Sequence, residues 1–199
     1  MIKFLYKIPN DIIVACSGGP DSMAVIDFLR NGRKRVTVAH FDHGTPHGVD
    51  ARKFVVEYCK SKDIPLIVGE IQRERLPEES LEEYWRNERI RFFHNHAPQE
   101  IITAHNLDDV VEWWMFTSLH GNPKLTPYRN KNIIRPFLIT PKSNLVSWCE
   151  RKNVPFLVDP SNFNVRFSRS RIRNNLLPEA LKINPGLRTV IRKKIERGI

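Results

Sequence analysis

The sequence predicts an α/β fold in which a parallel β-sheet is covered by helices on both faces, followed by a small basic helical segment. Short, continuously apolar runs, typical of strands buried on both sides, alternate with helix-like stretches over the first two-thirds of the chain. Strands and helices that alternate in this way form parallel sheets through right-handed crossovers. In such sheets ligands bind beyond the carboxyl ends of the strands, and three of the apolar runs end in clusters of polar residues.

Each element rests on its own local pattern. The apolar run 11–16 predicts the first strand and residues 20–30 the first helix, because Pro20 suits a helix start and Gly32 a helix end. Residues 121–132 are rich in Pro, Lys, Asn and Arg and are expected to form an irregular, mobile loop. The other expected strands are residues 36–40, 65–68 and 101–104, and the other expected helices are residues 50–62, 81–94, 107–119, about 141–153, 166–181 and 186–197.

The composition of the 199-residue chain fits one globular domain with a small appendage, since 41% of its residues are hydrophobic and 27% are charged. Its apolar runs fall short of the roughly 20 residues of a membrane span, and its N-terminus lacks the pattern of a signal peptide. Cys16, Cys59 and Cys149 lie far apart, which argues against a disulfide framework and suits a reducing compartment. We therefore expect a cytoplasmic protein without membrane contact.

The positive charge is concentrated near the C-terminus. The net charge is +10, and the stretch from Phe163 to Ile199 holds ten basic and only two acidic residues, so the preceding chain is nearly neutral. A basic surface of this kind is compatible with a nucleic acid, an anionic membrane or a solubilising role, and if it contacts phosphates the binding should weaken with salt. The basic candidates for phosphate contacts are Arg166, Arg169, Arg171, Arg173, Lys182, Arg188, Arg192, Lys193, Lys194 and Arg197.

The segment SGGPDS at residues 17–22 follows the first expected strand and is the most informative part of the sequence. Its glycines allow a close approach of the backbone to a ligand, and the helix that follows offers free N–H groups to an anion. A Walker A loop is excluded because no lysine follows the glycines. An ordinary turn with a helix cap is the alternative, but the polar residues at the neighbouring strand ends favour phosphate binding. The expected nucleotide contacts are Ser17, Gly18, Gly19, Pro20, Asp21 and Ser22.

Further blocks follow in order along the chain. They are His40-Phe-Asp-His-Gly44, Glu82 with Arg86-x-x-Arg89, Thr103-Ala-His-x-x-Asp-Asp109 with Glu112, Arg135-Pro-Phe-Leu138, Asp159-x-Ser-Asn162, Arg169-x-Arg-Ile-Arg173, Leu177-Pro178 and Asn184-Pro185. Together with the glycine loop, they resemble the tRNA(Ile)-lysidine synthetases, a branch of the N-type ATP pyrophosphatases (the PP-loop superfamily) with a Rossmann-like sheet. The resemblance covers about residues 12–187. The loop alone indicates the superfamily, whereas the ordered series is quite specific.

The resemblance implies a two-step ligase reaction on the wobble cytidine of an isoleucine tRNA. ATP adenylates the base oxygen and releases pyrophosphate, and the amino group of free lysine then displaces AMP to form lysidine. Residues 17–22 would clamp the pyrophosphate, and Mg²⁺ would neutralise the remaining charge. The implied cofactors are thus ATP and Mg²⁺, and the implied partners are isoleucine tRNA and lysine.

Acidic residues near the expected strand ends are candidates for metal binding and catalysis. Asp42, Asp108 and Asp109 would supply the hard oxygen ligands that Mg²⁺ prefers. Glu112 lies one helical turn beyond Asp108 and Asp109 and can share their face. Helix capping is the alternative role of Asp108 and Asp109. By analogy and electrostatics, Asp42, Asp109 and Glu112 are also catalytic candidates.

Two arginines and several histidines complete the candidate site. Arg86, a further catalytic candidate, and Arg89 share a helix face and could hold a carboxylate or phosphate, with surface salt bridges to neighbouring glutamates as the alternative. His40 and His105 are candidates for nucleotide contact, and a structural role is the alternative for His105. A zinc site built from the histidines of residues 40–47 is disfavoured because no cysteine supports it.

The sequence departs from the family pattern at Thr45, Pro46, Ile90 and His120, where relatives usually carry Leu, Arg, Tyr and Arg. These changes bear on lysine or cytidine contacts more than on ATP binding. The chain also stops soon after the catalytic core, so a minimal enzyme, a fragment and a relative with another substrate all stay open. We expect residues 1–140 to form the ATP pyrophosphatase domain and residues 141–199 a helical extension that completes the core and carries a tRNA-contact surface.

Three hypotheses for the function stay open at this point. The first is lysidine formation, with a homodimer as a further expectation. The second keeps the adenylating core but changes the nucleophile, as in tRNA thiolases or amide-forming ligases; thiolation commonly needs paired cysteines, which this sequence lacks. The third is a catalytically decayed RNA-binding relative, against which the intact glycine loop and the acidic residues count.

Overall fold

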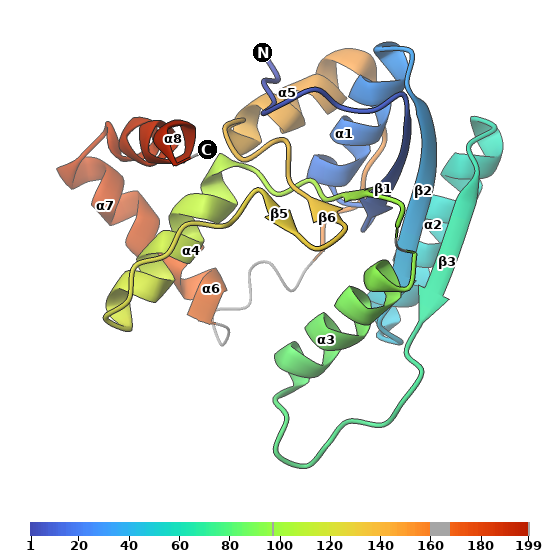
Figure 1. Ribbon diagram of the computed structural model, residues 1–199, viewed down its shortest axis with the longest axis horizontal. Helices are drawn as coiled ribbons and strands as arrows, with labels where there is room; N and C mark the ends of the chain where they lie inside the picture. Colours follow the sequence, from blue (N-terminus) through green and yellow to red (C-terminus); the bar gives the residue numbers. More distant parts are fainter. Residues whose placement is uncertain (97, 160–167, 199) are drawn as a thin grey trace.

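The computed structural model describes residues 1–96, 98–159 and 168–198. Its centre is a six-stranded sheet with the strand order β3-β2-β1-β4-β6-β5 (Figure 1). β5 is antiparallel to β6, and all other neighbouring strands are parallel, which confirms the predicted α/β class. The strands are β1 (Asp11–Cys16), β2 (Arg35–Asp42), β3 (Leu66–Glu70), β4 (Ile101–Ile102), β5 (Arg129–Asn130) and β6 (Ile133–Ile134).

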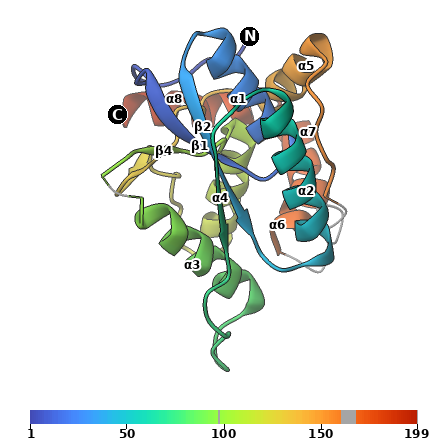
Figure 2. The same ribbon diagram turned by 90° about the vertical axis from the view of Figure 1, so that its right-hand side faces the viewer.

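Helices cover both faces of the sheet. Ile12, Val14 and Cys16 of β1 pack into the core formed with α1, α2 and α5, whereas Ile13 and Ala15 face the core that contains α3. Figure 2 shows α2 and α5 on one side of the strands and α3 on the other. The helices are α1 (Pro20–Asn31), α2 (Pro46–Ser61), α3 (Leu81–His94), α4 (Leu107–Leu119), α5 (Lys142–Lys152), α6 (Ser168–Arg171), α7 (Leu177–Ile183) and α8 (Leu187–Arg197).

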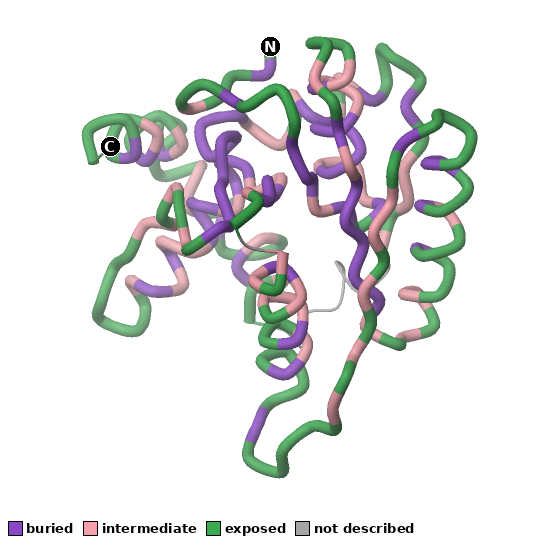
Figure 3. Tube along the Cα trace, turned by 45° about the vertical axis from the view of Figure 1, so that its right-hand side comes forward, coloured by how far each residue is buried: buried purple, intermediate pink, exposed green. Residues whose placement is uncertain are grey.

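The C-terminal helices form a second core with α4. Leu187, Ile191 and Ile195 follow one another at four-residue spacing on α8, so they form one apolar stripe, and all three are buried against this core. In Figure 1 the helices α6, α7 and α8 lie beside α4, on the opposite side of the molecule from β3. Figure 3 shows that buried residues lie along the strands and on the inner faces of the helices, and that exposed residues lie outside.

The sheet order fixes where a ligand can bind. The chain runs from β1 to β2 and β3 in one direction along the sheet and then crosses to β4 on the other side of β1, so the strand order reverses between β1 and β4. Ligands of parallel sheets bind at such a reversal, beyond the carboxyl ends of the strands. The loops after β1, β2, β4 and β6 therefore meet at one edge. No helix among the described residues is long and apolar enough to span a membrane.

Several predicted boundaries differ from the structure. Helix α2 begins at Pro46 instead of residue 50, because the Thr45 hydroxyl caps the helix by accepting from the Gly48 amide at 3.0 Å. Residues 101–104 form a strand only over Ile101–Ile102. The chain described at residues 168–183 is helical, but a π-helical turn at Ile172–Leu176 separates α6 from α7.

The predicted irregular loop at residues 121–132 is partly ordered. β5 falls inside it and forms an antiparallel hairpin with β6 at the sheet edge. Tyr128 packs edge-on against Tyr6 with ring centres 4.8 Å apart, and Arg129 forms an ion pair with Glu100. Strands of two residues carry too little periodicity to be recognised in a sequence, so these long-range contacts define them.

Candidate active site

The loop after β1 has the geometry of an anion cradle. Gly18 has a φ of +80°, in the region that favours glycine, and an added Cβ would lie 3.4 Å from the Phe54 ring. The Ser22 hydroxyl ties the loop together by donating to the Gly19 carbonyl at 3.0 Å and accepting from the Ser17 amide at 3.3 Å. The loop is therefore held in place by its own side chains.

The first turn of α1 leaves its amides available. Gly19 is the N-cap residue and provides no side-chain hydrogen bond, and Pro20 follows directly. The N–H groups of Asp21 and Ser22 consequently lack acceptors within the helix, and the positive end of its dipole points the same way. This arrangement suits a phosphate group, as the sequence predicts.

A lysine that the sequence analysis missed completes the loop. Lys142 is the first residue of α5, and its Nζ lies 2.6 Å from Asp21 Oδ2. The other carboxylate oxygen, Asp21 Oδ1, is buried and has no hydrogen-bond partner among the described residues. A basic residue at a helix N-terminus opposes the dipole, and this mismatch is the signal that could have revealed Lys142.

His40 lies beside the loop at the end of β2. Its Nδ1 is 2.9 Å from the carbonyl oxygen of Cys16, so Nδ1–H donates there and Nε2 is left as an acceptor. Burial lowers the pKa of His40, which keeps the ring neutral. Nε2 is buried without a partner among the described residues. His40 can thus accept one hydrogen bond from a ligand.

An acidic group lies at the start of α4. Asp109 caps the helix, with Oδ2 accepting from the Asn106 amide at 2.9 Å. Burial, followed by the charges of Asp21 and Glu112, raises the pKa of Asp109 to about 7. Arg173 compensates part of this negative charge, since it binds Glu112 with two hydrogen bonds of 2.5 and 2.9 Å and lies 3.5 Å from Asp109 Oδ1. Arg173, predicted as a tRNA contact, therefore belongs to the acidic group.

Asp108 has a different environment from its neighbour. Its Oδ2 accepts from the Lys142 backbone amide at 2.8 Å, and its Oδ1 lies 2.7–2.8 Å from the Arg188 guanidinium. Asp108 thus joins the starts of α4 and α5 to α8. Arg188, which the sequence presented as a phosphate contact, is engaged in this junction.

The structure does not bring the three predicted magnesium ligands together. Among the residues it describes, no group of three or more His, Cys, Asp or Glu side chains could hold a metal ion. Asp42 shapes the turn after β2, where Oδ1 accepts from the Gly44 amide at 2.8 Å and Oδ2 is 3.7 Å from Arg52. Asp108 faces α5 and α8, so of the three only Asp109 lies in the acidic group.

Removal of the Arg188 charge tests the role of Asp108. We expect Arg188→Gln to lower the free energy of unfolding by roughly 1–3 kcal/mol, because the Asp108 carboxylate would stay buried without its cation. Arg197→Gln, at an exposed position of the same helix, is the matched control and should change stability by less than about 0.5 kcal/mol. Urea denaturation measures both; equal midpoints would contradict the assignment.

Four arginines lie around His105 at the edge of the sheet. Arg86 and Arg89 come from α3, Arg135 follows β6, and Arg169 belongs to α6. Burial, followed by the charges of these four residues, lowers the pKa of His105 to about 3. The His105 ring is therefore neutral, and its Nδ1 lies 2.7 Å from the Thr103 hydroxyl.

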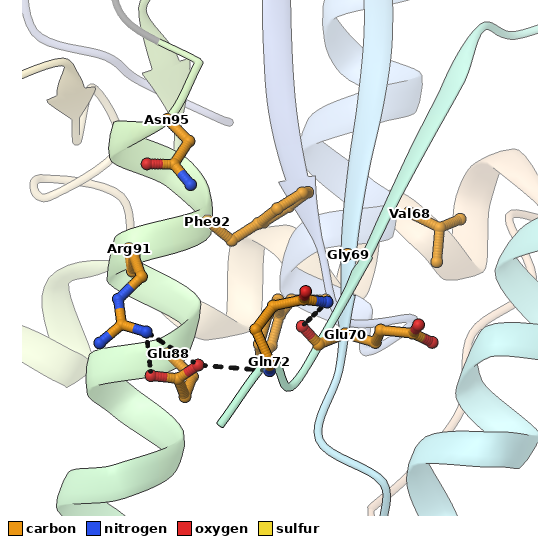
Figure 4. Close-up of a pocket in the computed structure, with 9 residues that line it drawn as sticks. Val68, Gly69, Glu70, Gln72, Glu88, Arg91, Phe92 and Asn95 are labelled. Atoms are coloured by element: carbon orange, nitrogen blue, oxygen red, sulfur yellow. Dashed lines mark hydrogen bonds and ion pairs between the residues drawn. The ribbon is translucent and has the colours of Figure 1, made fainter. Parts of the chain in front are cut away.

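A pocket on the α3 side of the sheet lies apart from the phosphate loop. Figure 4 shows Phe92 of α3 pointing toward β3, where an added Cβ on Gly69 would come within 2.4 Å of the ring. Glu88, one of the charged side chains that line the pocket, forms an ion pair with Arg91 at 3.1 Å. Its carboxylate also accepts a hydrogen bond from the Gln72 amide at 3.4 Å. This pocket accordingly has internal partners for its charges.

Comparison with known proteins identifies the family. A family profile described as a PP-loop domain matches residues 2–180. The chain belongs to the PP-loop domain family. The match includes the phosphate loop, the acidic group and the four arginines, but it ends before α8.

Curated relatives of this PP-loop domain share about 30% of its residues. The tRNA(Ile)-lysidine synthase of Thermotoga maritima is 31% identical over 191 residues, which are 87% of this chain and 46% of the relative. The corresponding synthase of Thermosipho africanus is 29% identical over 98% of this chain and 51% of its own length. The bifunctional protein TilS/HprT of Listeria innocua is 27% identical over 92% of this chain and 31% of its own length. The chain spans about a third to a half of the length of these relatives.

Solved structures show the same fold. The NH3-dependent NAD synthetase of Campylobacter jejuni superposes with a TM-score of 0.53 at 13% identity, covering 96% of this chain and 86% of the other. The NMN synthetase of Francisella tularensis gives a TM-score of 0.53 at 14% identity, covering 85% and 77%. At these identities the likeness concerns the fold of the PP-loop domain alone.

The predicted nucleic-acid contacts fall into three groups: residues outside the described part of the chain, residues engaged in contacts within the protein, and exposed residues. Arg166 lies outside the described residues, as do Ser161 and Asn162 of the Asp159 block. Arg173 faces the acidic group, and Arg192 is half-buried on α8. Arg169 lies over the Trp113 ring, with its guanidinium carbon 5.2 Å from the ring centre. The exposed members are Arg169, Arg171, Lys182, Lys193, Lys194 and Arg197.

Proposed function

We propose that the chain is an ATP-dependent tRNA-modifying ligase, and specifically that it adenylates the wobble cytidine of an isoleucine tRNA and joins lysine to it. The observation that carries the proposal is the phosphate loop, with its free helix amides and Lys142, directly beside the acidic group. The relatives named tRNA(Ile)-lysidine synthase support the choice of RNA and nucleophile. The chain spans about half of the length of those relatives, so the full activity is part of the proposal.

ATP would bind with its β- and γ-phosphates at residues 17–22. Attack of the cytidine oxygen on the α-phosphorus forms the new P–O bond and breaks the bond to pyrophosphate, whose charge increases as it leaves. The amides of Asp21 and Ser22 and the Lys142 ammonium group are placed to stabilise that charge. His40 Nε2 and His105 are the candidates for contacts to the nucleoside.

The donor set fits a magnesium ion. Asp21 has a buried carboxylate oxygen without a partner among the described residues, and burial, followed by the charges of Asp21 and Glu112, raises the pKa of Asp109. Mg²⁺ commonly uses one or two carboxylates together with substrate phosphates, and Asp21 and Asp109 are the residues that would hold it. When bound, it would neutralise the departing pyrophosphate. Asp42 is assigned to the turn after β2 instead of the metal, because its two oxygens lie near the Gly44 amide and the Arg52 guanidinium.

In the second step the lysine amine attacks the activated carbon and AMP leaves with the former base oxygen. A cation near the departing phosphate favours this step. Glu112 holds Arg173 with two hydrogen bonds and keeps it within 3.5 Å of Asp109, so Glu112 acts as a positioning residue for that cation. Arg86 is proposed to contact the RNA or lysine.

The alternatives are less well supported. Cys16, Cys59 and Cys149 are all buried, and burial raises the pKa of each thiol, which makes them poor nucleophiles for a thiolase. A decayed RNA-binding relative would not need Lys142 at the loop or the acidic group at the start of α4. An amide-forming ligase with another amine as nucleophile is the remaining alternative.

The organisation of the chain is part of the same proposal. We assign residues 1–140 to the ATP pyrophosphatase domain and residues 141–199 to an extension, whose α5 contacts α1 through Trp148 and Asp27 at 2.8 Å. The exposed residues Arg171, Lys193 and Lys194 would contact tRNA. Cytoplasmic activity and a homodimer are further parts of the proposal.

The test is to incubate the protein with ATP, Mg²⁺, labelled lysine and a mixed tRNA pool. We expect label to enter isoleucine tRNA with one pyrophosphate released for each lysine joined. Pyrophosphate release with tRNA but without lysine uptake would favour another nucleophile. RNA binding without any pyrophosphate release would contradict an enzymatic function.

A further inference from the structure

The cluster formed by Arg86, Arg89, Arg135 and Arg169, named here the arginine cluster, has no internal counter-charge. None of the four forms an ion pair among the described residues, and residues 160–167 contain no Asp or Glu. The glutamates Glu82 and Glu83, one turn before Arg86, are exposed and form no ion pair with Arg86 or Arg89. The salt bridges that the sequence allowed for Arg86 and Arg89 are therefore absent from the described residues.

The nearby acids are paired elsewhere. Glu88 and Glu79 bind Arg73, Glu112 binds Arg173, and Asp108 binds Arg188 at distances of 2.5–2.9 Å. Arg91, on the same helix as Arg86 and Arg89, contacts Glu88 (Figure 4). Arg73, Arg173 and Arg188 thus have carboxylate partners, whereas no ion pair among the described residues involves the arginine cluster.

Two arginines of the cluster show the effect of the missing counter-charges in their pKa and hydrogen bonding. Burial, followed by the charges of Arg86 and Arg169, lowers the pKa of Arg89 to about 10. Arg135 is only 7% exposed, and while one terminal nitrogen donates to the Pro127 carbonyl at 3.0 Å, its Nε is buried without a partner among the described residues. Unpaired buried donors and like charges destabilise a fold, so a ligand that compensates them is expected.

We propose that the arginine cluster is a binding site for the backbone phosphates of the RNA next to the nucleotide that is modified. Four guanidinium groups exceed what one amino-acid carboxylate can neutralise, but they match successive phosphates of a polyanion. The cluster also runs from the buried Arg135 to the exposed Arg86 and Arg169. ATP phosphates are already accounted for by residues 17–22 and Lys142.

The position of Arg169 supports an RNA ligand. Its guanidinium lies over the Trp113 ring at 5.2 Å, a contact that fixes the group while its N–H donors stay free. Two residues further on α6 is the exposed Arg171. The cluster is therefore continuous with the basic C-terminal surface. The RNA is the substrate of the proposed reaction, so its identity depends on the proposed function.

The test measures RNA binding without turnover. A short RNA stem–loop with cytidine in its loop is titrated at several salt concentrations against wild type, Arg86→Gln, Arg89→Gln and Arg169→Gln. We expect each variant to bind about 3- to 10-fold more weakly and to reduce the slope of log affinity against log salt by about 0.7–1. Arg89→Lys, which keeps the charge, should retain most of the slope. Arg91→Gln, whose residue already has a partner, is the control and should match wild type.

Three results would overturn the proposal: unchanged affinity and slope in all the cluster variants, a raised KM for lysine at unchanged RNA affinity, or a weakened ATP affinity alone. The second would assign the cluster to the lysine carboxylate and the third to ATP. Thermal unfolding of each variant controls for misfolding. If the slopes change as expected but wild type releases no pyrophosphate, the phosphate site stands and the proposed reaction fails.

Discussion

Replacement of Asp109 by Asn is expected to abolish pyrophosphate release while making the protein more stable above neutral pH. The carboxylate is central to the proposed adenylation, and its loss should reduce turnover by at least about 10³-fold. The pKa of Asp109 is about 7 in the folded protein against 3.8 ordinarily. Between these values the folded state binds more protons than the unfolded state, so stability falls as pH rises from about 4 to 7.

Asp109→Asn removes this loss. In metal-free buffer we expect it to raise the free energy of unfolding by about 1–2 kcal/mol at pH 8 and by little at pH 4, since the amide oxygen can still accept from Asn106. Asp108→Asn is the matched control: it breaks the pair with Arg188 and should destabilise the protein. Urea denaturation across pH decides the matter. A destabilised Asp109→Asn, or one with normal turnover, would contradict the assignment.

Replacement of Lys142 by Met is expected to slow pyrophosphate release about 100-fold. The ammonium group lies 2.6 Å from Asp21 at the phosphate loop, so it is placed to meet the charge that develops on pyrophosphate. Because this interaction strengthens as the pyrophosphate leaves, the variant should lose kcat more than it raises the KM for ATP. Single-turnover measurement of pyrophosphate release at saturating ATP gives this directly.

Lys152→Met is the control for Lys142. Lys152 is at the other end of α5, where its ammonium group lies 5.5 Å from the Trp148 ring centre, and its loss should leave the rate unchanged. Lys142→Arg keeps the charge and should restore part of the rate. If Lys142→Met turned over ATP as fast as wild type, the lysine would serve only to pair with Asp21.

Much of the fold could be predicted because β1 and β2 are largely buried strands and β1, β2 and β3 all carry short apolar runs between polar segments. The phosphate loop was equally accessible, since its glycines stand between a strand and a helix and polar residues follow the neighbouring strands. β5 and β6 were missed because two-residue strands are defined by their neighbours. The start of α2 was missed because the apolar spacing that predicts this helix begins only near residue 50, whereas the Thr45 cap and Pro46 extend it by one turn.

The candidate site was predicted less completely, because charge pairs depend on distances that the sequence does not contain. Arg173 and Arg188 resembled RNA contacts, but they meet Glu112 and Asp108 across 61 and 80 residues. The same limit applies to the four arginines of the cluster, which the sequence distributed over α3, α6 and the segment after β6. Among the described residues the cluster has no ion pair, because the nearby acids bind Arg73, Arg173 and Arg188 instead.

The most direct test of the central claim is whether the protein adenylates RNA at this site. With α-labelled ATP, Mg²⁺ and isoleucine tRNA but no lysine, we predict that label becomes attached to the tRNA, and that added lysine then releases it as AMP. The Asp109→Asn variant should attach none while still binding the tRNA. Release of labelled AMP without any labelled tRNA at any time, or labelling that persists in Asp109→Asn, would contradict the account.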